Sequence, residues 1–192
     1  MKKLVKGRPG YIRRRKNRYL MWAILEFAVV LSLFAIGIWQ TGSRKNILTI
    51  VAIVGCLPAA KMLVEYIVML PFKGINKNYG KEIKEKASLL VTVYDLIFTC
   101  NEKLMQVDAI VISDHVVCGY TSYEKTDEKA VTDMLKNLLA SENYERMTVK
   151  IFHDYTAFLS RAEGLNSMAD VSNTSQGRKE KGIRHLLLSV SM

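Results

Sequence analysis

Two apolar stretches decide the fold: "YLMWAILEFAVVLSLFAIGIWQ" at residues 19–40 and "ILTIVAIVGCLPAAKMLVEYIVML" at residues 47–70. The first contains one charged residue, Glu26, and the second contains two, Lys61 and Glu65. A helix of about 20 apolar residues is long enough to cross the hydrocarbon core of a bilayer. Because only six residues separate the two stretches, the sequence predicts a membrane α-helical hairpin made of two transmembrane helices.

A cleaved signal peptide is the main alternative for residues 19–40. Its apolar core would span about 7–15 residues and would end at a cleavage site of small residues. The stretch here is longer and ends in Trp39 and Gln40. We therefore expect the first helix to be retained in the mature protein.

The distribution of basic residues predicts the orientation of the hairpin. Residues 1–18 hold nine of the ten net positive charges and no acid, whereas the loop at 41–46 has two basic residues. Lysine and arginine favour the cytoplasmic side of short loops, so we expect both termini in the cytoplasm and the protein in the plasma membrane. The basic cluster serves as a topology signal and attracts anionic lipid headgroups; its members are Arg13, Arg14, Arg15, Lys16 and Arg18. Since the basicity is local to this segment, nucleic acid is not an expected partner.

The rest of the chain has the pattern of a small mixed domain. Residues 71–80 contain Pro, Gly and Asn and are expected to be a linker. Residues 81–192 are expected to form a cytoplasmic α/β (α+β) domain that contains a three-strand antiparallel meander. The expected elements are a short leading helix, strands at 89–100, 107–113 and 116–122, a helix at 126–144, a strand at 147–153, a helix at 154–164, a mobile loop at 166–183 and a strand at 185–191.

The three charged residues within the spans form the first candidate site. With a rise of 1.5 Å per residue, Glu26, Lys61 and Glu65 lie about 7–13 Å from the cytoplasmic ends of their helices. Charges at such depth normally pair or face a protein interior. One interpretation is a polar clamp that fixes the pairing of the two helices. Alternatives are a docking site for a charge on a partner's helix and part of an ion or proton path. Pro58 is expected to kink the second span.

The second candidate is Asp108, in the soluble domain. The expected order of a helix, three strands, a helix and a strand resembles the core of the PD-(D/E)xK nucleases. That resemblance implies metal-dependent phosphodiester cleavage, with an acid on the second strand and Glu-x-Lys on the third. Asp108 matches the acid, but residues 116–122 contain no Glu-x-Lys. Histidine and cysteine residues lack metal-ligand spacing, so neither a metal nor a cofactor is expected.

Together these patterns favour a protein that tethers a small cytoplasmic domain to the membrane as a non-enzymatic interaction or regulatory module. The expected partners are the bilayer and a membrane or cytoplasmic protein, or a second copy of the chain. A membrane-tethered hydrolase or nuclease-like enzyme with a degenerate site is the alternative, and a subunit of a transport complex is a further one.

Overall fold

The computed structural model describes residues 5–41, 47–144, 146–171 and 177–192. The chain divides into two compact units, an α-helical hairpin at Ile12–Pro71 and an α/β unit. The α/β unit is discontinuous in sequence, because it combines the chain up to Tyr11 with the chain from Phe72 onward. The hairpin is therefore inserted into the α/β unit.

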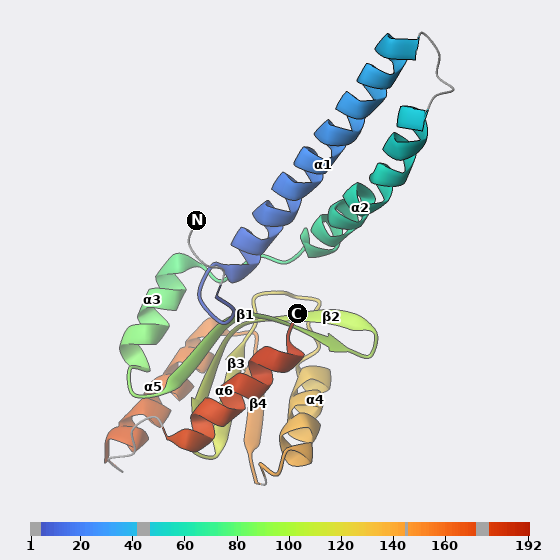
Figure 1. Ribbon diagram of the computed structural model, residues 1–192. Helices are drawn as coiled ribbons and strands as arrows, with labels where there is room; N and C mark the ends of the chain where they lie inside the picture. Colours follow the sequence, from blue (N-terminus) through green and yellow to red (C-terminus); the bar gives the residue numbers. More distant parts are fainter. Residues whose placement is uncertain (1–4, 42–46, 145, 172–176) are drawn as a thin grey trace. The chain divides into compact units, whose positions relative to one another are not determined.

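The hairpin consists of α1 (Tyr11–Thr41) and α2 (Ile47–Met69), which run antiparallel (Figure 1). Both are long and apolar enough to cross a membrane, and most of their side chains are exposed in the isolated chain. The helix α1 begins at Tyr11, whereas the sequence predicted a span from residue 19 and a separate basic segment before it. Residues 13–18 are consequently helical, so the basic cluster and the apolar stretch belong to one continuous helix.

Small residues bring the two helices of the hairpin together. Ala52 and Ala59 of α2 are buried, as are Ala23 and Val30 of α1. A Cβ atom built at Gly55 would lie 3.1 Å from the Val30 side chain. Small side chains permit close approach where lipid gives no hydrophobic drive for association.

The α/β unit is built on a mixed four-stranded sheet in the order β1-β2-β3-β4 (Figure 1). The first three strands are antiparallel, and β4 is parallel to β3. The elements are α3 (Lys77–Lys86), β1 (Val91–Cys100), β2 (Lys103–Ser113), β3 (Val116–Tyr120), α4 (Glu128–Ser141), β4 (Thr148–Phe152), α5 (Tyr155–Val171) and α6 (Arg178–Val190).

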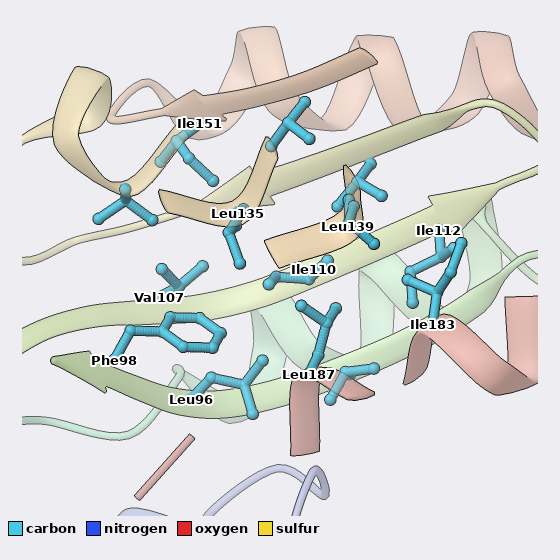
Figure 2. Packing of buried hydrophobic residues seen from close by; sticks show 14 of the residues in the cluster. Leu96, Phe98, Val107, Ile110, Ile112, Leu135, Leu139, Ile151, Ile183 and Leu187 are labelled. Carbon is cyan, nitrogen blue, oxygen red and sulfur yellow. The ribbon is translucent and has the colours of Figure 1, made fainter. Parts of the chain in front are cut away.

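Helices cover both faces of this sheet. The helices α4 and α6 bury Leu135, Leu139, Ile183 and Leu187 against one face, as Figure 2 shows. The helices α3 and α5 cover the other face, where Phe158 is fully buried. The result is a three-layer α/β/α arrangement, in which each helix presents one apolar stripe to the sheet.

Three sequence predictions need correction. The expected antiparallel meander is present in β1 to β3, but β4 makes the sheet mixed. The expected C-terminal strand is the helix α6, because Ile183 and Leu187 are four residues apart and share one buried face. The expected loop at 166–183 is helical in most of its described part, since α5 runs past Gly164 to Val171.

Candidate functional site

The three charged residues within the apolar stretches differ in their exposure. Lys61 is exposed, whereas Glu26 and Glu65 are half-buried. The Oε2 atom of Glu26 is buried and has no hydrogen-bond partner. Among the described residues, no ion pair joins Lys61 to either glutamate. The clamp between these three groups therefore stays a prediction.

Glu65 has a different neighbour from the one that the sequence suggested. The Tyr19 hydroxyl interacts with Glu65 and also accepts hydrogen bonds from the Arg15 guanidinium at 3.0 and 3.1 Å. Arg15 and Tyr19 belong to α1 and Glu65 belongs to α2. A tyrosine hydroxyl thus connects an arginine of one helix to a carboxylate of the other.

The basic cluster is only partly exposed. Arg13, Arg14 and Arg18 are exposed, and Arg15 and Lys16 are half-buried. The Lys16 ammonium donates to the carbonyl oxygen of Leu70 at 3.2 Å, near the end of α2. A cation at this end suits the negative pole of the α2 dipole. Pro58 lies inside α2, which continues on both sides of it.

The segment before α1 is packed into the α/β unit. The Gly7 carbonyl oxygen accepts a hydrogen bond from the Tyr94 N–H at 3.1 Å. The Lys6 ammonium donates to the carbonyl oxygens of Leu188, at 2.9 Å, and of Ser191. These carbonyls lie at the C-terminus of α6, where a helix leaves acceptors without intrahelical donors. Gly7 has a φ of +81°, and a Cβ there would lie 2.8 Å from Leu188, so a side chain is excluded.

The segment after α2 is held by a buried polar network. We call this set the linker network; its members are Asp95, Gln106, Asp108, Thr121 and Thr126, all nearly inaccessible to solvent. The Gln106 amide oxygen accepts from the Lys73 N–H at 3.1 Å, and its amide nitrogen donates to the Lys73 carbonyl. The Asp95 carboxylate accepts from the Ile75 N–H at 2.8 Å. Two side chains of the sheet therefore satisfy the backbone of a segment outside it.

Asp108 completes this network. Its carboxylate accepts from the Gln106 amide nitrogen and, at 2.6 Å, from the Ser122 N–H. Burial raises the pKa of Asp108, and the hydrogen bonds from Ser122 and Gln106 oppose that rise. Both oxygens are engaged and the residue is 1% exposed, so the carboxylate acts as a structural acceptor within the sheet.

Asp95 and Asp108 mark a change of face in two neighbouring strands. The pairs Tyr94↔Ala109 and Leu96↔Val107 flank them, and Asp95 has a φ of 56°. A left-handed residue interrupts the alternation of side chains between faces. As a result Val93 and Leu96, three residues apart, both enter the core beneath α4 and α6.

A surface hollow lies where β3 and β4 end, next to the place where the nuclease resemblance puts its site. It has a volume of about 420 Å³ and is lined by Tyr120, Thr121, Ser122, Glu124 and His153. Asp108 reaches its edge only through the Ser122 N–H. Within the described residues, no group of three or more His, Cys, Asp or Glu side chains could hold a metal. The order of elements that carried the resemblance is present, but the metal-binding chemistry that it implies is not formed in this part of the chain.

Sequence reasoning missed Gln106, Lys6 and Tyr19. A lone glutamine in "KLMQVDAIVIS" gives no motif, although the shift in apolar spacing between Val107 and Ile110 indicates an irregularity at Asp108. Lys6 lies among basic residues that the sequence analysis had already assigned to a topology signal, so nothing distinguished it from them. Comparisons with models of protein families, with curated proteins and with solved structures found no match.

Proposed function

We propose that this protein is an integral membrane protein whose hairpin holds the α/β unit at the cytoplasmic face of the plasma membrane. The unit acts there as a non-enzymatic interaction or regulatory module. The observation that carries the proposal is that both chain connections to the hairpin are fastened to the α/β unit. Lys6 and Gly7 bind α6 and β1, and Lys73 and Ile75 bind Gln106 and Asp95.

Two chain segments that are hydrogen-bonded to the α/β unit restrict its motion more than one flexible linker would. A free linker of several residues lets a domain diffuse over the membrane surface. Here a change in the spacing or tilt of α1 and α2 would act directly on the backbone next to β1 and β2. Such coupling suits a module that reports the state of a membrane partner to a cytoplasmic one.

The same connections support the proposed topology. Residues 6 and 7 hydrogen-bond to Leu188, Ser191 and Tyr94, so the segment before α1 and the domain after α2 must share one side of the membrane. An even number of spans meets this condition. Cleavage after the first span would remove Lys6 and Gly7 and leave the end of α6 without its donor.

Lys61 supports an interaction within the membrane. An exposed lysine on an apolar helix is costly in lipid unless it reaches the interface or meets an acid. Leu57, one turn away on the same face, is also exposed. A partner helix that offers a carboxylate at this depth, from a second copy or another protein, would satisfy the ammonium group.

The enzyme alternative is less well supported. It requires a carboxylate that is free to bind metal or substrate, whereas both oxygens of Asp108 accept hydrogen bonds inside the sheet. The transport alternative requires several hairpins around a wet path, and it would place Glu26 and Lys61 in contact with water.

Topology is tested by labelling single cysteines with a membrane-impermeant maleimide in whole cells. In a Cys56→Ser background, Ser43→Cys should react in intact cells, and Lys125→Cys should react only after lysis. Labelling of position 125 in intact cells would contradict a cytoplasmic α/β unit.

The intramembrane contact is tested with a photoreactive amino acid at Leu57. Irradiation in membranes should yield a protein adduct of defined mass, and Lys61→Ala should reduce it. The matched control is Ala59, which is fully buried in the hairpin and should give no adduct with another protein. Adducts to lipid alone at position 57 would remove the argument for a partner on this face.

A further inference from the structure

A second cavity lies at the opposite end of the strands from the hollow beside His153, and it does not depend on the hairpin. Its volume is about 300 Å³. The wall is formed by the start of β1, the turn between β2 and β3, the last turns of α5 and the first turn of α6, with Leu90, Ile112, Val116 and Leu165 as apolar lining. Small-molecule sites are typically concave and mostly apolar, with a few placed polar groups, and begin at about this size.

The side chain of Glu180 lines this cavity and has a buried oxygen atom that a purely structural role does not explain. Glu180 is 6% exposed, lines the cavity, and has an Oε2 atom that is buried without a hydrogen-bond partner. An ionised carboxylate in such a setting is strongly unfavourable unless a cation or several donors compensate it. The helix dipole favours an acid in the first turn of α6, but that effect is small beside the cost of burial.

The lysine next to Glu180 in the sequence, Lys179, interacts with other side chains. The Lys179 ammonium lies 3.5 Å from Asp114 and 3.2 Å from the His115 ring. His115 in turn lies 3.0 Å from the other oxygen of Asp114. Arg184, one turn further along α6, forms no ion pair with Glu180 in the described part of the chain. Within the described residues, Asp114 therefore has two ion-pair partners, and Glu180 has none.

We propose that this cavity binds a small primary amine with a compact apolar body, its ammonium group paired with Glu180. The apolar walls contributed by β1, β2 and α5 would cover the body of the ligand. An anion would face the uncompensated carboxylate of Glu180. A neutral apolar molecule would leave Glu180 uncompensated, and the described residues offer no cluster of ligands for a metal ion.

The test uses phenethylamine as the probe, with the full-length protein in nanodiscs and isothermal titration calorimetry. Phenethyl alcohol has the same carbon skeleton without the charge, and 3-phenylpropionate carries the opposite charge. Wild type should bind the amine at least about tenfold more tightly than the alcohol, because hydrogen bonds to charged groups are the stronger ones. Glu180→Gln should lose this preference for the amine. The heat measured with this variant in the same nanodiscs also corrects for partition of the probe into lipid.

A second variant separates loss of the site from loss of the fold. Ala169 lines the cavity at the end of α5, and Ala169→Phe should fill it and abolish binding of both amine and alcohol while Glu180 is kept. Hydrogen exchange in α6 should be unchanged in both variants. Equal affinity of wild type and Glu180→Gln for the amine, stronger binding of 3-phenylpropionate, or absence of binding at millimolar amine would each overturn the proposal.

Discussion

Replacing Gln106 with leucine should detach the segment after α2 from the sheet. Leucine has a similar volume but removes two hydrogen bonds to the Lys73 backbone and one to the Asp108 carboxylate. A buried hydrogen bond contributes about 1 kcal/mol, and one to a charged group about 2 kcal/mol. We therefore expect Gln106→Leu to lower the free energy of unfolding by about 4 kcal/mol, a large part of the stability of an ordinary domain.

The assay must report on the α/β unit and not on the hairpin. Trp22 and Trp39 both lie in α1, so tryptophan fluorescence would follow the wrong unit. Cys100 and Cys118 are buried in the α/β unit, whereas Cys56 is exposed in α2. In a Cys56→Ser background and a mild detergent, thiol labelling as a function of urea measures the opening of the α/β unit.

The matched control is Thr99→Val, an exposed polar-to-apolar change in β1. It should shift stability by no more than about 0.5 kcal/mol. Hydrogen exchange at residues 72–76 should rise in Gln106→Leu and stay unchanged in the control. A loss below about 1 kcal/mol, with residues 72–76 still protected, would refute the view that Gln106 holds this segment.

Three further predictions concern other parts of the chain. Burial raises the pKa of Asp108 above its ordinary 3.8. The folded state should therefore lose stability as the pH rises from about 4 through the folded pKa. Urea titrations across this range should show that Asp108→Asn removes this pH dependence of stability. Gly119→Ala should cost about 1–3 kcal/mol in the same assay, because its Cβ would lie 2.6 Å from Ile151 Cδ1, and adding Ile151→Val should recover part of the loss. If the intramembrane clamp exists, Lys61→Ala should lower the melting temperature of the hairpin in detergent and Glu26→Ala should restore part of it, whereas additive losses would exclude the pairing.

Local patterns in the sequence were sufficient for most elements. The apolar stretches identified both helices of the hairpin, and the helix expected at 126–144 is α4, which buries Val131, Leu135 and Leu139. The residue that caps α4 is Asp127, whose carboxylate accepts from two N–H groups at the start of the helix. The hydroxyl of Thr126, one residue earlier, donates to the Gln106 carbonyl oxygen.

What the sequence did not reveal depends on contacts between distant segments. The crossover through α4 makes β4 parallel to β3; the sequence predicted this strand–helix–strand order, but not that these two strands pair. The role of Gln106 requires Lys73 to lie beside it, and that of Lys6 requires the last turn of α6. The cavity beside Glu180 likewise brings together β1, the turn between β2 and β3, α5 and α6, so an acid whose sequence position indicates only the start of a helix becomes buried.

The insertion of the hairpin into the α/β unit has a consequence for biosynthesis. Lys6 and Ser191 are 185 positions apart and still form a hydrogen bond, so this contact forms only after residue 191 has left the ribosome. If the hairpin spans the membrane as proposed, a chain that inserted one helix in the wrong orientation would place Lys6 and Gly7 on the far side of the bilayer. The Tyr94 N–H and the end of α6 would then lack their partners, and the unit would be less stable. Under the proposed topology, a stable α/β unit therefore forms only when both helices have been inserted in the correct orientation.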